Sequence, residues 1–288
     1  MSSTADKYYV PHGSHWPIVG TFGLMALTIG LANLFNGNHW GSYLAYAGAA
    51  VVIYMLWGWF GEQITESLKG LYNRQVDVSY RMGMTWFIFS EVMFFAAFFG
   101  ALFYARTYSI PWLGGEGSGA WTNFVLWNNY ETEWPTNGPA GIGGPFETIP
   151  AWGIPFLNTL ILLTSGLTIT LAHWAVKKRQ QMQQVLWLTA TVVLGVVFLY
   201  FQAHEYVEAY TELNLTLESG IYGSTFFMLT GFHGLHVTLG TLMLIVITFR
   251  AAKGHFTPEK HFAFEAVAWY WHFVDVVWLG LFIFVYVL

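Results

Sequence analysis

The stretch that decides the fold runs from Phe264 to Trp278 and reads FEAVAWYWHFVDVVW. Together with the apolar residues that follow, it is long enough to cross a bilayer, which takes about 20 residues of helix. Three ionisable residues lie inside it: Glu265, His272 and Asp275. Such groups are costly in hydrocarbon and usually face protein, water or a partner. Glu265 and His272 share one helical stripe and Asp275 lies beside it, so we predict that this helix presents a polar stripe to a neighbour.

The composition indicates an integral membrane protein. Of the 288 residues, 55% are hydrophobic and 9% are charged, whereas soluble domains carry about 25% charged residues. The chain has no Cys, which excludes disulfides, thiolate metal sites and cysteine nucleophiles.

The apolar runs predict an all-α membrane protein with seven transmembrane helices. Each run is near the length that a span requires, and none shows the strict alternation of a strand. The predicted spans are 17–36, 41–61, 82–106, 155–176, 185–204, 220–249 and 264–288.

The basic residues predict the orientation of these spans. All Lys and Arg except Arg106 fall on the side of the N-terminus, while the opposite loops are acidic. Positive residues are retained on the cytoplasmic side of a membrane. We therefore expect a multi-pass protein with a cytoplasmic N-terminus and an external C-terminus.

Two connections suggest how the spans are grouped. The charged link 62–81 separates the first two spans from the other five, which predicts an N-terminal part, 1–81, and a five-helix bundle, 82–288. The long outer loop 107–154 is rich in Gly, Pro and Trp. Such a loop is too aromatic for simple disorder, so we expect it to fold over the outer surface or against a partner.

Glu91 lies near the middle of the third predicted span. It could relay protons, or hydrogen-bond a ligand or a lipid headgroup. Alternatively, it could be a neutral structural acid bonded to a neighbouring helix, because burial favours the protonated form of a carboxyl group. Its position alone leaves both interpretations open.

The deep histidines favour packing over metal binding. His233 and His236 share one face of the sixth span, yet no third ligand stands at ligand spacing on that helix. His272 with Asp275 is interpreted as a buried pair rather than a catalytic dyad, and Glu265 could reach a histidine of the sixth span. We therefore predict a buried polar network of these five residues, with no metal site and no catalytic residue.

His12 and His15 precede the first span. Imidazoles titrate near neutral pH, so these two could pass protons at the membrane surface, or they could belong to an ordinary solvated tail.

Three other classes of membrane protein can be tested on the residues. A retinal protein needs a Lys in its last span, and 264–288 has none. A haem-bearing oxidase subunit needs many intramembrane histidines, but only His233, His236 and His272 lie deep. A transporter usually shows an inverted repeat, which is not evident here. A stand-alone proton-coupled transporter or channel using Glu91 nevertheless remains the alternative.

The chain resembles subunit III of cytochrome c oxidase along nearly all spans and in order. The motifs that carry the resemblance are SEVMFF at 90–95, PFLNT at 155–159, QAHEY at 202–206, YGSTFF at 222–227, GFHGLHV at 231–237 and FEAVAWYWHFVDVVWL at 264–279.

This resemblance implies a non-catalytic subunit with no redox cofactor on this chain. It would pack on the catalytic subunit I, with subunit II in the same complex, and haem and copper would reside in those partners. It would hold phospholipids in a cleft between the first two helices and the other five, and it would support proton uptake and stability. Glu91, Trp59 and Arg81 match the family's lipid-site positions, and the tail histidines, His12 and His15, resemble its proton-entry surface.

Membrane lipids are thus expected partners, and nucleic acid is not. The absence of Cys and the unusual outer loop favour a bacterial plasma membrane over a mitochondrial inner membrane.

Overall fold

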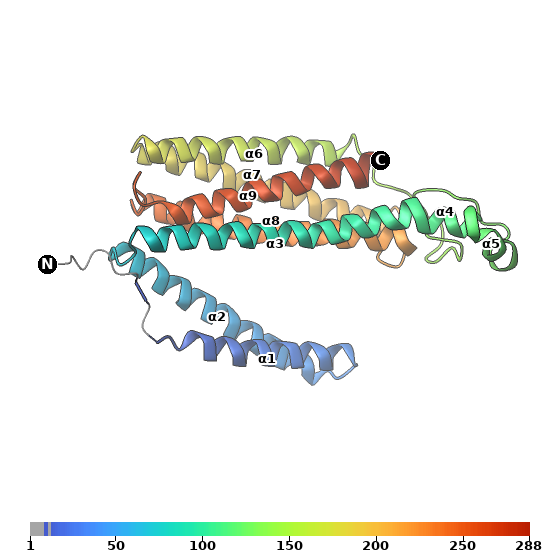
Figure 1. Ribbon diagram of the computed structural model, residues 1–288, viewed down its shortest axis with the longest axis horizontal. Helices are drawn as coiled ribbons and strands as arrows, with labels where there is room; N and C mark the ends of the chain where they lie inside the picture. The colour runs from blue at the N-terminus through green and yellow to red at the C-terminus, as the bar shows by residue number, and fades with distance from the viewer. Residues whose placement is uncertain (1–8, 11–12) are drawn as a thin grey trace. The chain divides into compact units, whose positions relative to one another are not determined.

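The computed structural model describes residues 9–10 and 13–288, and over these residues it contains helices and no strand (Figure 1). The α-helices are α1 (Trp16–Phe35), α2 (Trp40–Leu68), α3 (Arg74–Tyr104), α4 (Ile110–Leu113), α5 (Ala120–Leu126), α6 (Ile154–Lys177), α7 (Gln181–Thr211), α8 (Gly220–Ala252) and α9 (Phe262–Leu281). Two π-helical turns, Ala105–Ser109 and Phe282–Val287, and a 3-10 turn, Gly117–Gly119, complete them.

In the part of the chain that the structure describes, seven helical segments are long and apolar enough to cross a membrane, which confirms the predicted fold class. Several boundaries differ from the prediction. The third span is helical from Arg74 to Leu113, and the link predicted at 62–81 is mostly helix, because α2 runs to Leu68. A helix satisfies its own backbone hydrogen bonds, so it can continue past the apolar stretch that periodicity detects.

The chain divides into two compact units, Met1–Met82 and Gly83–Leu288. In the first unit, α1 and α2 form an antiparallel hairpin (Figure 1). Glycines mark its contacts: a Cβ at Gly30 would meet the backbone of Ala45, and one at Gly48 would meet the backbone of Leu27. Without a strong hydrophobic drive inside lipid, close contact of small residues holds such helices together.

The second unit is built around α9. Trp271 and Trp278 are fully buried, and their indole N–H groups donate to Ser165 at 2.8 Å and to Thr159 at 2.9 Å, both on α6. A Cβ at Gly195 of α7 would come within 2.9 Å of the Trp271 ring. The two tryptophans therefore fill the space between α9 and its neighbours while their polar atoms stay paired.

The outer loop packs on the connection between α7 and α8. The side chain of Asn214 donates to the carbonyl groups of Gly143 and Pro145 at 3.0 and 2.9 Å, and Phe146 stacks on Tyr222 with ring centroids 5.5 Å apart. The loop thus folds over this end of the second unit, which was one of the two outcomes expected from its composition.

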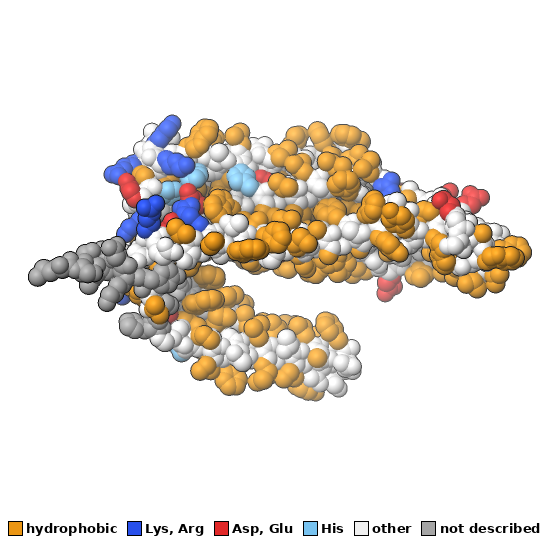
Figure 2. Space-filling view, viewed as in Figure 1, with side chains coloured by type: hydrophobic (Ala, Val, Ile, Leu, Met, Phe, Trp, Pro, Cys, Tyr) orange, Lys and Arg blue, Asp and Glu red, His pale blue; other side chains and the backbone are white. Residues whose placement is uncertain are grey.

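Charge is distributed unequally between the two ends of the second unit. Basic side chains gather at the end where α6 and α8 finish, and acidic ones are prominent near the outer loop (Figure 2). The basic residues are Lys177, Lys178, Arg179, Arg250, Lys253 and Lys260. At this end Arg179 donates to Glu259 at 2.8 Å. A backbone hydrogen bond and Arg179 together hold the pKa of the Glu259 carboxyl below its usual range.

Candidate functional site

Glu91 on α3 forms a hydrogen-bonded pair with His236 on α8. Their Oε2 and Nε2 atoms are 2.9 Å apart. The other ring nitrogen of His236 lies 2.6 Å from the carbonyl oxygen of Phe232 and donates to it. Because that nitrogen holds a proton, a second proton must lie between Nε2 and the carboxyl group, as either a neutral pair or an ion pair.

Aromatic rings surround this pair. Phe94 and Phe95 lie 6.0 and 5.0 Å from the His236 ring, and Tyr270 stacks on it at 6.2 Å. The side chain of His236 is 10% exposed and that of Glu91 is 22% exposed. The Glu91 carboxyl group is therefore tied to a neighbouring helix and still reaches the surface of the second unit.

The other deep residues of the predicted network have separate partners. The Nε2 atom of His233 lies 3.2 Å from the carbonyl oxygen of Val274, and the residue is fully buried. The nearest nitrogen of His272 is 3.7 Å from Asp275. The His272 side chain is 47% exposed and that of Asp275 is 9% exposed, so only the carboxylate of this pair is buried.

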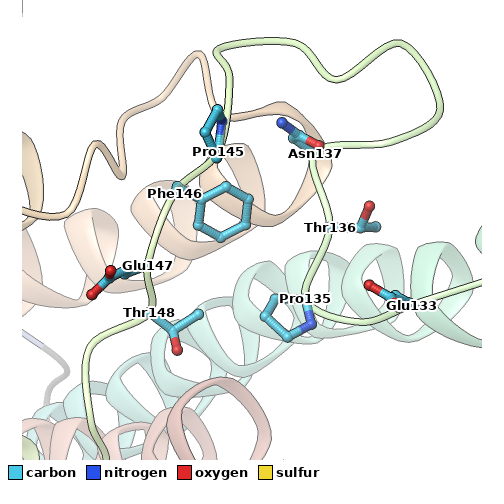
Figure 3. A pocket seen from close by; sticks show the side chains of 8 residues that line it. All are labelled: Glu133, Pro135, Thr136, Asn137, Pro145, Phe146, Glu147 and Thr148. Atoms are coloured by element: carbon cyan, nitrogen blue, oxygen red, sulfur yellow. The ribbon is translucent and has the colours of Figure 1, made fainter.

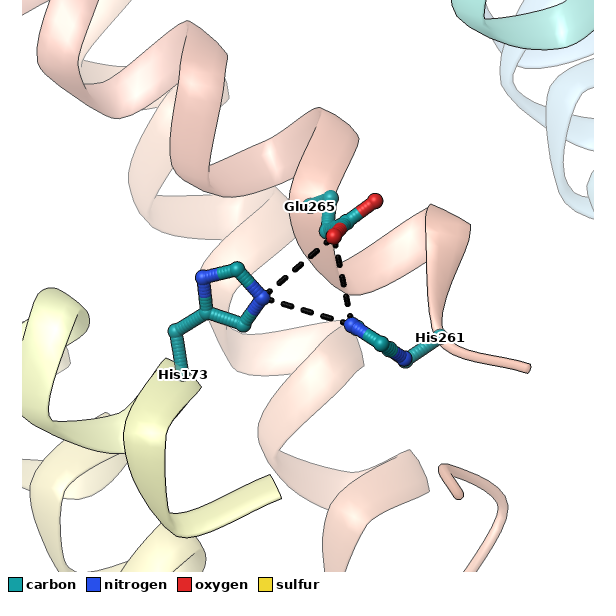
Figure 4. A group of neighbouring side chains, drawn as sticks. All are labelled: His173, His261 and Glu265. Atoms are coloured by element: carbon teal, nitrogen blue, oxygen red, sulfur yellow. Dashed lines mark hydrogen bonds and ion pairs between the residues drawn. The ribbon is translucent and has the colours of Figure 1, made fainter. Parts of the chain in front are cut away.

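Glu265 lies beside two histidines outside the sixth span. Its Oε1 atom is 3.4 Å from Nε2 of His173 on α6 and 3.2 Å from Nε2 of His261, the residue before α9 (Figure 4). The sequence suggested that Glu265 could reach a histidine of the sixth span. In the structure those two histidines have other partners, since His236 pairs with Glu91 and His233 lies against a backbone carbonyl group. Sequence reasoning missed His173 and His261. The i, i+4 spacing of His261 and Glu265 was the available signal.

The remaining predicted residues lie in or before the first unit's helices. Trp59 is 45% exposed on α2 and stacks on Phe60. Arg81 pairs with Asp77 at 2.8 Å. His15 is exposed and lies against Trp16, whereas His12 lies outside the described residues.

An open pocket of about 520 Å³ lies in the outer loop (Figure 3). Its walls come from 133–137 and 145–148, with Glu133 and Glu147 as its acidic side chains. Its lining holds no histidine, and it belongs to the loop rather than to the helical core that contains the polar residues.

Comparison with known proteins assigns the chain to a family. The family model described as cytochrome c oxidase subunit III matches residues 6–288. The chain belongs to the cytochrome c oxidase subunit III family. This confirms the resemblance drawn from the helix motifs.

Named relatives come from eukaryotes and from a bacterium. Cytochrome c oxidase subunit 3 of Marchantia polymorpha is 42% identical over 285 residues, which cover 99% of this chain and 97% of the relative. The Arabidopsis thaliana protein of the same name is 41% identical over 287 residues, covering 99% and 98%. The probable cytochrome c oxidase subunit 3 of Rickettsia prowazekii is 40% identical over 284 residues, covering 98% and 95%. The similarity therefore extends over whole chains.

Proposed function

We propose that this chain is the non-catalytic subunit III of a proton-pumping cytochrome c oxidase, packed on the catalytic subunit I with subunit II in the same complex. The observation that carries the proposal is the family match over residues 6–288. Membership makes the chain part of an oxidoreductase complex. Haem and copper would be held by the partner subunits, and this chain would support their turnover.

Purification of the tagged chain in mild detergent tests this proposal. We expect it to bring down a larger partner with a haem a absorption spectrum and cytochrome c oxidase activity. A tag on a different membrane protein from the same cells is the control. A colourless chain isolated alone, from cells that contain the oxidase, would instead favour the stand-alone transporter.

We also propose that Glu91, Trp59 and Arg81 contact phospholipid. Within the second unit, the position of Glu91 supports lipid contact. Its carboxyl group is paired with His236 and is still partly exposed among apolar residues of α3. Trp59 and Arg81 offer an exposed indole and a guanidinium group, which suit the level of lipid headgroups. His12 and His15 remain proposed proton-surface residues on the same family argument.

The distribution of charge supports the proposed orientation. The basic ends of α6 and α8 would face the cytoplasm, and the acidic outer loop would face the opposite side. We propose a bacterial plasma membrane as the location, with the N-terminus cytoplasmic and the C-terminus outside.

Glu91→Gln is expected to preserve oxygen reduction within about twofold, which corresponds to a few tenths of a kcal/mol, and to lower the phospholipid retained by the purified complex. The amide can still hydrogen-bond His236, but it cannot carry charge or donate a carboxyl proton. Lipid phosphorus per haem and steady-state oxygen consumption are the measurements.

Glu212→Gln makes the same chemical change at the exposed end of α7 and should alter neither quantity. Complete loss of electron transfer in a normally assembled Glu91→Gln complex would contradict the non-catalytic assignment. Unchanged lipid content would count against lipid binding at Glu91.

A further inference from the structure

We propose that α5 docks a positively charged protein domain on the outer side of the membrane, and that this domain belongs to another subunit of the oxidase assembly. The docking surface consists of the large apolar side chains of α5, which we call the outer patch: Trp121, Phe124, Val125 and Leu126. They are 63–77% exposed, and apolar side chains gather at this tip of the outer loop (Figure 2). This docking surface rests on the proposed function, because its partner is a subunit of that assembly.

The polarity of α5 is the reverse of that of an ordinary surface helix. Its polar residue Asn123 faces inward, where the side-chain amide donates at 3.0–3.3 Å to three carbonyl groups of the loop, those of Leu113, Trp127 and Tyr130. The apolar side chains of the outer patch face outward instead. A surface helix normally turns its apolar stripe to the core of its own protein, so this arrangement favours a partner that covers the patch.

The outer patch lies in water rather than in the bilayer. The helix that precedes it runs over 40 residues, Arg74–Leu113, which is about 60 Å at 1.5 Å per residue. A bilayer with its headgroups is about 40–45 Å thick. α5 follows that helix and lies beyond the ends of α6 and α9 (Figure 1). Contiguous apolar side chains exposed to water in this way mark contacts with another protein.

The outer patch is held in a fixed shape before any partner binds. The rings of Trp121 and Phe124 pack edge to face with centroids 6.0 Å apart. The indole N–H of Trp112, at the end of α4, donates to Ser118 at 3.2 Å, and a Cβ at Gly119 would meet the Trp112 carbonyl group. A surface that is already ordered loses little conformational entropy on binding, which favours docking.

Charge selects the kind of partner. The loop 107–154 contains four Glu and no Lys, Arg or His. Glu116 precedes α5, Glu131 and Glu133 follow it, and all three are exposed. A positively charged surface is therefore attracted, whereas anionic lipid or a second copy of this acidic loop is repelled. Permanent interfaces are also more apolar than transient ones, which favours a subunit of the assembly over a passing soluble protein.

Thiol reactivity in the purified assembly tests the docking surface, because this chain has no Cys of its own. Phe124→Cys places a thiol in the outer patch. Ile142→Cys is the matched control in the same loop, since Ile142 is 58% exposed and the adjacent Gly143 is bonded to Asn214 rather than to α5. With an uncharged polyethylene glycol maleimide, Phe124→Cys should react at least about tenfold more slowly, because its thiol is reached only when the partner dissociates.

The order of the two rates is decisive, because Phe124 is the more exposed of the two residues on this chain, at 68%. Equal or faster reaction of Phe124→Cys, in an assembly that carries haem, would overturn the docking surface and leave the proposed function intact. A chain recovered without any haem-bearing partner would overturn both.

Reversal of charge beside the outer patch tests the positive charge of the partner. In the Phe124→Cys background, Glu116→Lys should raise the reaction rate several-fold, because like charges then face each other. Glu212→Lys makes the same change at the exposed end of α7 and should leave the rate unchanged. Salt at about 1 M, which shortens the screening length to about 3 Å, should also raise the rate. A rate that responds to neither Glu116→Lys nor salt would overturn the charge assigned to the partner.

Two other occupants of the outer patch give different results. A lipid surface would protect Phe124→Cys in native membranes but not in the detergent-purified assembly. A second copy of this chain would give a disulfide-linked dimer of Phe124→Cys on mild oxidation. Either result would overturn the proposal.

Photo-crosslinking covers the case in which the cysteine variants fail to assemble. p-Benzoylphenylalanine in place of Phe124 keeps an aromatic side chain in the outer patch. Irradiation of the purified assembly should link this chain to one other subunit, through a peptide of that subunit that contains Lys or Arg. No crosslink, or a crosslink only to lipid or to another copy of this chain, would refute the docking surface.

Discussion

Trp271→Ala is expected to destabilise the second unit by about 3–5 kcal/mol, the range for removing a large buried aromatic side chain. The ring is fully buried and lies against Gly195 and Gly240 on two neighbouring helices. Those glycines cannot extend into the space that the ring would leave. The substitution also removes the indole N–H that donates to Ser165 at 2.8 Å.

The amount of this chain in the membrane and the apparent melting temperature of the purified assembly measure the effect. Trp271→Phe keeps most of the ring and loses the N–H group, so its cost should be smaller, although the lost volume adds to the roughly 1 kcal/mol of a hydrogen bond. Trp86→Ala is the control, because Trp86 is 67% exposed on α3. If Trp271→Ala and Trp86→Ala had equal effects, α9 would not be the centre of this unit.

The sequence was sufficient for the number of spans and for the importance of α9, because both depend on local composition. Length and hydropathy define a span regardless of its neighbours. The stripe on α9 was predicted to meet other elements, and Glu265 does contact His173 on α6. Boundaries were less accurate, since α3 begins at Arg74 within a charged segment where apolar periodicity gives no signal.

Pairing between helices could not be predicted in the same way. Glu91 and His236 are 145 positions apart, and nothing in either local sequence specifies the other. His173 joins Glu265 only because α6 and α9 pack side by side. With one sequence, such contacts have to come from the tertiary structure.

Gly48→Leu is expected to disrupt the α1–α2 hairpin more than a substitution at any exposed position of the hairpin does. A Cβ at this position would collide with the backbone of Leu27 and with the carbonyl oxygen of Gly23, 2.8 Å away. Backbone atoms cannot turn aside as a flexible side chain can, so the two helices must separate. Overpacking of this kind costs about 1–3 kcal/mol or more, and separation also weakens the contacts of Gly30 and Gly41, which depend on the same close approach.

The absence of Cys in this chain makes the separation measurable. Spin labels on cysteines introduced at Phe22 and Tyr54, which are 61% and 62% exposed on the two helices, report the distance between α1 and α2. Gly48→Leu should lengthen and broaden that distance distribution. Gly61→Leu is the matched control on α2, because nothing lies within 4 Å of its Cβ position and Leu favours a helix over Gly. An unchanged distribution in Gly48→Leu would mean that the glycine contacts do not hold the hairpin, and that its helices are kept together by whatever covers their exposed faces.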